Sequence, residues 1–223
     1  MPLASRAPAF PAAVYAIVAL NVAVFSYEAL LPGGARDAFI AANALVPYDL
    51  TRGVQLAAGP PTVATLVTSQ FLHASAPHIF FNLLFLGAFG PQIEYLTGTV
   101  RFVGFYLGCG ILGGLAQVSV DPGSHLPEIG ASGAIAGVLG AYIVRFPTMP
   151  VLRLPAFVVI GVWAAVQFVH GFGALSTDVL SERGGGTAYF AHIGGFLAGV
   201  FAIGLFCIRS ASGTGPHFRS YHR

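Results

Sequence analysis

Apolar residues run through this chain in long stretches that are separated by short polar or Pro/Gly-rich segments. A helix needs about 20 mainly apolar residues to cross a bilayer core that is roughly 30 Å thick. Six stretches come near this length, so we expect helices at residues 12–31, 78–96, 101–120, 131–146, 155–172 and 187–208. The pattern predicts an all-α membrane protein, built as a bundle of six transmembrane helices.

Two segments depart from this simple pattern. The fourth stretch is short for a full span, so its helix would begin below the membrane surface. Lipid cannot form hydrogen bonds with the backbone N–H groups at the start of such a helix. We therefore expect the start of this helix, near residue 131, to lie inside the protein or beside a wet cavity. The segment 32–77 is long for a connection and still apolar, so we expect it to lie against the bundle or in the membrane interface.

The arginines predict the orientation, because positive charge is retained on the cytoplasmic side of a membrane. With the N-terminus inside, the opposite side holds only Arg36, Arg52 and Arg183, and the cytoplasmic segments hold Arg6, Arg101, Arg145, Arg153, Arg209, Arg219 and Arg223. We expect both termini in the cytoplasm. Residues 1–11 would form a cytoplasmic N-terminus, 12–208 the membrane domain and 209–223 a disordered cytoplasmic tail.

Composition supports a protein that has the lipid bilayer as its solvent. Charged residues make up 8% of the chain and the mean hydropathy is +0.78, whereas about a quarter of a soluble domain is charged. The net charge of +2 comes without a basic patch, so we expect no nucleic-acid partner. The two cysteines, Cys109 and Cys207, have no metal-ligand spacing and indicate small buried side chains.

Four polar residues stand within apolar stretches or at their ends, where a polar side chain is costly and is a candidate for function. They are His78, Asn82, Ser132 and His192. By the predicted topology, all four lie toward the external side of the membrane and can meet. His78 and Asn82 are four residues apart on one helix, so they share a face from which both can donate hydrogen bonds.

Ser132 and His192 each lie on a helix with a face of small residues. Ser132 begins the fourth helix within GASGAIAG, where backbone N–H groups and the positive end of the helix dipole can stabilise a negative oxygen. Gly195 and Gly199 follow His192 on its helix. Small-residue packing explains these glycines by itself. It also allows the two helices to approach so closely that the hydroxyl and the imidazole come within hydrogen-bond reach.

Together these motifs resemble those of the rhomboid intramembrane serine proteases. The resemblance rests on GxSGxxxG, on a sixth-helix His followed by three glycines, and on a second-helix HxxxN that follows another His. In this chain these residues are Gly130, Ser132, Gly133 and Gly137; His192, Gly194, Gly195 and Gly199; and His78, Asn82 and His73. The match extends over residues 12–208.

The resemblance implies a Ser/His dyad without an acidic third member. Ser132 would attack the scissile carbonyl, and His192 would act as its general base. His78, Asn82 and the Ser132 backbone N–H would form the oxyanion hole, beside Gly130 and Gly133. Helix packing would fall to Gly137, Gly195 and Gly199. The substrate would be a single-pass transmembrane protein cut near its external membrane boundary, and a bacterial plasma membrane is the expected location.

Two features depart from the family pattern. The aromatic residue that relatives place four positions after the serine, against the imidazole, is Ala136 here, and the Trp-Arg pair of the first loop is absent. By spacing, Phe196 is the residue that we expect to restrain the imidazole instead. The remaining polar groups are interpreted as structural: Glu94 paired with Arg101, His73 under the roof of the site, and Trp163, Gln167, His125 and His170 as interface anchors or interhelical contacts.

Three other functions are compared with that of a serine protease. A non-catalytic rhomboid-like protein that binds membrane helices for trafficking or quality control is the main alternative, although such proteins typically lack the Ser or the His. A transporter would have broken helices in paired halves, and no internal repeat is seen. A zinc peptidase is disfavoured because no HExxH occurs. We expect neither a metal ion nor a cofactor.

Overall fold

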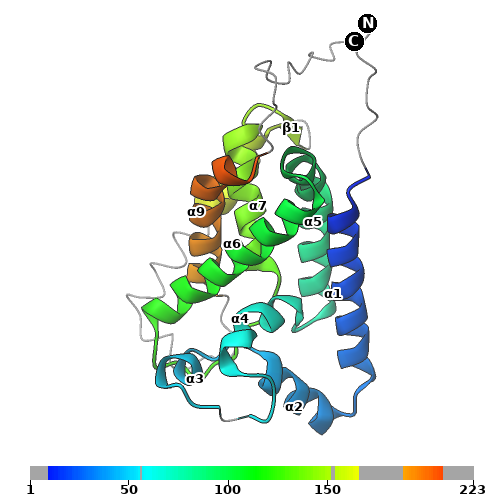
Figure 1. Ribbon diagram of the computed structural model, residues 1–223. Coiled ribbons are helices and arrows are strands. Elements are labelled where there is room, and N and C mark those ends of the chain that lie inside the picture. The colour runs from blue at the N-terminus through cyan, green and yellow to red at the C-terminus, as the bar shows by residue number, and fades with distance from the viewer. Residues whose placement is uncertain (1–9, 56, 152–153, 166–187, 208–223) are drawn as a thin grey trace, which may run out of the picture.

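The computed structural model describes residues 10–55, 57–151, 154–165 and 188–207, and its elements are almost all helical (Figure 1). In chain order they are α1 (Ala12–Leu30), α2 (Gly33–Asn43), α3 (Pro47–Arg52), a 3₁₀ turn (Thr62–Ala64), α4 (Thr65–Thr68), a second 3₁₀ turn (Ser69–Phe71), α5 (Ala76–Thr97), α6 (Thr99–Val120), α7 (Ser132–Arg145), β1 (Pro150–Val151), β2 (Leu154–Pro155), a helical segment (Ala156–Ala165) and α9 (Tyr189–Phe206). The two short strands pair antiparallel, with Pro150 opposite Pro155. The predicted all-α class is confirmed.

Each of the six predicted spans contains a helix. Among the described residues, α1, α5, α6 and α9 are long and apolar enough to cross a membrane, whereas α7 has only 14 residues. The fifth predicted span, 155–172, is described up to residue 165, and its described part is an apolar helix. Its remainder lies outside the described residues, as do Gln167, His170 and the predicted tail at 209–223.

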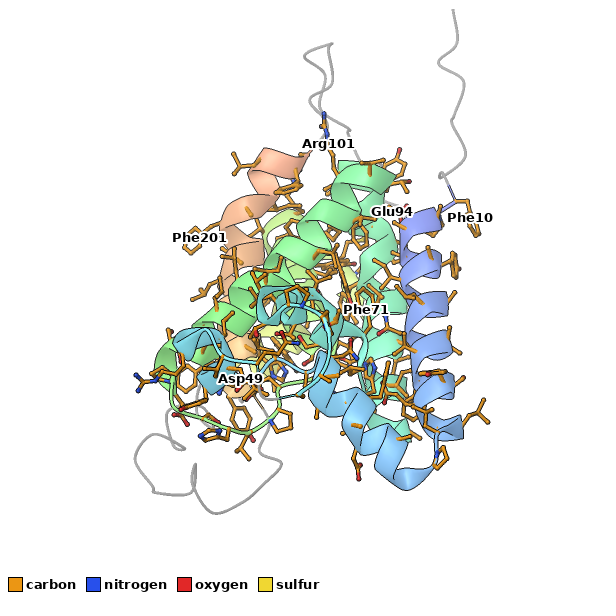
Figure 2. The ribbon with its side chains drawn as sticks, turned by 60° about the horizontal axis from the view of Figure 1, so that its bottom comes forward. Phe10, Asp49, Phe71, Glu94, Arg101 and Phe201 are labelled. Atoms are coloured by element: carbon orange, nitrogen blue, oxygen red, sulfur yellow. The ribbon has the colours of Figure 1, made fainter. Side chains whose placement is uncertain are left out.

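The short helix α7 forms the centre of the bundle. It contacts α5, α6 and α9, and all of its residues from Gly133 to Tyr142 are buried. The outer helices turn apolar side chains outward, and Figure 2 shows Phe201 projecting from α9 away from the bundle. Phe201 is 78% exposed. Outward apolar side chains with a buried central helix are the arrangement expected of a bundle in lipid.

Segment 32–77 packs against one end of the bundle, as expected from its apolar composition. Figure 1 shows α2, α3 and α4 gathered at that end, below α5 and α6 in the view. Leu45 and Glu128 exchange two backbone hydrogen bonds of 3.1 and 2.8 Å, and the Ser69 carbonyl accepts one of 2.9 Å from Gly130. The segment therefore holds the loop that leads into α7.

Glu94 stabilises the opposite end of the bundle. Its carboxylate oxygens accept hydrogen bonds of 2.9 Å from the backbone N–H groups of Ala13 and Val14 and one of 2.9 Å from the hydroxyl of Thr99. Figure 2 shows Glu94 beside the start of α1. A carboxylate at this position satisfies donors that have no partner within the helix. The predicted pair with Arg101 is wrong, since the Arg101 guanidinium donates to the Cys207 carbonyl at 3.5 Å.

Candidate active site

Ser132 is the first residue of α7, where the chain emerges from the loop held by segment 32–77. Gly130 precedes it with a φ of +125°, a conformation that favours glycine. A Cβ at Gly130 would stand 2.9 Å from Nε2 of His78 and 3.7 Å from Oγ of Ser132. Glycine is therefore required here on two grounds, and it lets the His78 ring and the serine hydroxyl lie on the same side of the loop.

His192 lies in the first turn of α9, and its Nε2 is 2.7 Å from Oγ of Ser132. The imidazole is 8% exposed. When Nε2 carries no proton, it accepts the hydrogen bond from the serine hydroxyl. The two residues are 60 positions apart in the chain, so their contact depends on how closely α7 and α9 approach each other.

Glycines on both helices permit this approach. A Cβ at Gly195 would overlap the Gly133 carbonyl, and a Cβ at Gly199 would overlap the Gly137 carbonyl. A Cβ at Gly137 would in turn overlap the Cys109 side chain of α6. The three glycines predicted to pack helices thus lie at backbone contacts where even a methyl group has no room.

His78 and Asn82 line the same cavity as Ser132 and His192. His78 lies in the first turn of α5, where Oγ of Ser75 accepts a 3.3 Å hydrogen bond from its backbone N–H. Asn82 is buried one turn further along, and its Nδ2 has no hydrogen-bond partner in the described part of the chain. The cavity measures about 260 Å³ and is also lined by Trp163. A free amide donor beside a serine hydroxyl suits stabilisation of a negative oxygen.

A family model of the rhomboid domain matches residues 60–209 of the chain. The chain belongs to the rhomboid family. It is 30% identical to the mitochondrial Rhomboid protein 1 of Saccharomyces cerevisiae over 191 aligned residues. The alignment covers 84% of this chain and 51% of the yeast protein. It is 29% identical to rhomboid protease GluP of Bacillus subtilis over 212 aligned residues, and this alignment covers 94% of this chain and 38% of GluP.

A further relative is the putative rhomboid protease YdcA of Bacillus subtilis, 37% identical over 78 residues that cover 35% of this chain and 39% of YdcA. The chain thus spans about half or less of the length of these relatives. Membership of the rhomboid family, together with the apolar helices, makes this an integral membrane protein.

In this rhomboid, an aromatic ring from another helix, that of Trp163, lies beside the imidazole, and the role expected of Phe196 stays a prediction. The ring centroids of Trp163 and His192 are 6.0 Å apart, and Phe196 contacts Trp163 at 6.1 Å. Ala136, the position at which the family resemblance led us to expect an aromatic residue, is fully buried. Trp163 thus makes an interhelical contact, one of the two roles expected for it, although its sequence position alone gives no sign that its helix faces α9.

A smaller cavity of about 40 Å³ lies beside Ser132, away from the helical segment Ala156–Ala165. Its polar lining comes from Ser69, Gln70 and Glu128 as well as Ser132, and the buried Oε1 of Gln70 has no partner within the described residues. Burial, followed by the charge of Asp121, raises the pKa of Glu128 to about 7. The cavity has polar groups and room for a few water molecules, which a hydrolase needs near its nucleophile.

The other predicted polar residues occupy structural positions. His73 is fully buried, and its ring meets the His78 ring edge-on with centroids 5.1 Å apart. His125 stacks on Tyr48 with centroids 4.2 Å apart. In the described ranges, no group of three or more His, Cys, Asp and Glu side chains is arranged to hold a metal ion.

Proposed function

We propose that this rhomboid is an intramembrane serine endopeptidase in which Ser132 is the nucleophile and His192 the general base. The observation that carries the proposal is the 2.7 Å separation of His192 Nε2 and Ser132 Oγ at a cavity within the helix bundle. A serine hydroxyl and a buried imidazole at this distance form the activated pair that acyl transfer requires. The protease names of the bacterial relatives support the same chemistry.

The first half of the reaction forms an acyl-enzyme. Ser132 Oγ attacks the scissile carbonyl carbon while its proton passes to Nε2 of His192. The carbonyl oxygen becomes negative, and Asn82 Nδ2, the His78 ring and the Ser132 backbone N–H at the start of α7 are the donors that would stabilise it. When the tetrahedral intermediate collapses, the C–N bond breaks and His192 returns the proton to the leaving amine.

The second half of the reaction hydrolyses the acyl-enzyme and so regenerates the free Ser132 hydroxyl. A water molecule from the small cavity beside Ser132 gives a proton to His192 and attacks the acyl carbon. Collapse of this second intermediate breaks the C–Oγ bond, frees the carboxyl product and returns the proton to Oγ. The substrate would be a single-pass transmembrane protein whose scissile bond enters the 260 Å³ cavity, where Phe81, Phe85 and Leu139 supply apolar surface for a side chain.

The test is cleavage of purified substrate by purified enzyme in lipid vesicles. We expect the parent protein to cut a single-pass transmembrane substrate at one site near the membrane boundary, identified by mass spectrometry of the products. If the parent protein binds such substrates in the vesicles but cuts none, the proposal is wrong and a binding role replaces it.

The oxyanion hole can be tested separately. We expect His78→Ala and Asn82→Ala each to lower kcat by about 10- to 100-fold with little change in KM, because these side chains stabilise charge that develops after binding. His125→Ala is the control, since His125 stacks on Tyr48 of α3 and does not line the cavity of Ser132 and His192. If both site variants turn over at the parent rate, the two residues do not stabilise the oxyanion.

The support of the imidazole by Trp163 gives another expected result. Trp163→Ala should lower kcat by about tenfold because the His192 ring loses a neighbour that limits its orientation, and Trp163→Phe should retain more activity. Phe201→Ala removes an exposed aromatic side chain from α9 and serves as the control. Parent or higher turnover in Trp163→Ala would instead mean that this ring limits access to the cavity.

A further inference from the structure

Behind His78 lie two fully buried polar side chains that the proposed reaction does not use. Glu28 and His73 are both 0% exposed. No hydrogen bond of good geometry reaches either carboxylate oxygen of Glu28 or either ring nitrogen of His73 from the described groups. The backbone groups that face them are the N–H of His73, toward Glu28, and the carbonyl of Phe71, toward the His73 ring. Buried polar atoms are nearly always hydrogen-bonded to protein or ordered water, and leaving four of them without a partner costs free energy.

The position of Glu28 makes its burial more unusual. It lies in the last turn of α1, where the negative end of the helix dipole disfavours a carboxylate. Two groups from other elements attract this carboxylate. They are the backbone N–H of His73 and the positively charged guanidinium of Arg36, at the start of α2. The buried Nε of Arg36 also has no partner in the described ranges. A polar site therefore exists where α1, α2 and the approach to α5 meet.

Glu94 shows how this chain treats a buried carboxylate that has a structural role. It is also almost fully buried, and its oxygens accept hydrogen bonds from two backbone N–H groups of α1 and from Thr99. Glu28 accepts no comparable set of well-formed hydrogen bonds from the described residues. Helix capping thus explains Glu94 and leaves Glu28 unexplained.

His73 connects this polar site with the proposed active site. Its ring meets the ring of His78 edge-on, with centroids 5.1 Å apart and planes at 67°. Burial, followed by the charge of His78, lowers the pKa of His73 to about 4. At neutral pH, His73 therefore carries one N–H donor, which faces the Phe71 carbonyl, and one nitrogen acceptor, which can bond to a water molecule.

We propose that Glu28, His73 and one or two bound water molecules form a buried hydrogen-bond network that fixes the orientation of the His78 ring. Glu28 is then a positioning residue for the oxyanion hole, which it does not touch. We assign water to the site because the atoms without a well-formed hydrogen bond include acceptors, on Glu28, and a ring that can donate or accept, on His73, and water can bond to both. The expected effect on turnover rests on the proposed function, whereas the existence of the hydrogen-bond network does not depend on it.

The test combines turnover with the ¹⁵N NMR signals of the histidine rings in Glu28→Ala and Glu28→Gln. We expect Glu28→Ala to lower kcat about tenfold with KM unchanged, and Glu28→Gln, which keeps one acceptor oxygen, to lose less. The ring signals of His73 and His78, assigned with His73→Gln and His78→Gln, should shift in both Glu28 variants. Labelling of Ser132 by a fluorophosphonate should persist, since the dyad is intact.

Glu94→Gln is the matched control for a buried carboxylate. It should lower the thermal midpoint and leave the ring signals of His78 in place. If the Glu28 variants leave the ring signals of His78 unchanged, or turn over at the parent rate, Glu28 does not position this residue. The NMR measurement needs no activity, so a parent protein that cleaves nothing overturns the proposed function while the network is still tested by the shifts.

Discussion

Cleavage of a transmembrane substrate is expected to fall to background when either Ser132 or His192 is replaced by alanine. The loss should be on the order of 10⁴-fold or more in kcat, because the hydroxyl has no proton acceptor without the imidazole and no covalent bond forms without the hydroxyl. The double variant should be no worse than either single one, since the two groups act as a unit. The measurement is the initial rate of product formation in lipid vesicles for all four proteins.

Folding must be separated from chemistry in this comparison. Ser119→Ala is a matched control, because among the described residues the Ser119 hydroxyl donates only to the Ala116 carbonyl within α6. Both site variants should keep the parent thermal midpoint in detergent, since each removes a few atoms from the wall of a cavity. Cleavage within tenfold of the parent rate by either folded variant would contradict the assignment of the dyad.

Inactivation is also expected when a side chain is added to Gly199. A Cβ at this position overlaps the Gly137 carbonyl, so α7 and α9 must separate and the 2.7 Å contact between Oγ and Nε2 must lengthen. We expect Gly199→Ala to lower kcat by at least about 100-fold, and Gly199→Leu to be inactive with a reduced thermal midpoint.

Gly204 on the same helix offers the control, because a Cβ there meets nothing within 4 Å. Gly204→Ala should match the parent in activity and in thermal midpoint, whereas both properties should fall in Gly199→Ala. Parent-like turnover in Gly199→Ala would mean that the close approach of the two helices does not set the geometry of the dyad.

Helix positions could be predicted to within a few residues because the bilayer fixes how long an apolar stretch must be. The second span was expected to begin at 78, and α5 begins at Ala76. Its local signals explain the difference, since Ser75 caps the helix and Pro77 sits in its first turn. Such capping residues lie outside the apolar run, so a search by hydropathy alone places the boundary too late.

Contacts between helices were harder to predict. Nearly all-apolar helices have no polar face that fixes their rotation, so hydropathy does not predict which residue Trp163 meets on a neighbouring helix, or that Glu94 and Arg101 bind different partners. Small residues were the exception. Gly195 and Gly199 mark a face by the absence of side chains, and this pattern predicted that α9 approaches α7 beside Ser132 and His192.

Orientation and host membrane stay predictions. Arg153, Arg209, Arg219 and Arg223, which carry much of the argument for cytoplasmic termini, lie outside the described residues. Curated relatives are both bacterial and mitochondrial by name, so family membership is compatible with either membrane.

The most direct test of the central claim is to find which atom reacts as the nucleophile. The parent protein in lipid vesicles is treated with a fluorophosphonate, digested and mapped by mass spectrometry. We predict a single adduct on Ser132 that is absent or strongly reduced in His192→Ala, because the hydroxyl is activated only when the imidazole can take its proton. An adduct on a different serine, or undiminished labelling of Ser132 in His192→Ala, would contradict the dyad.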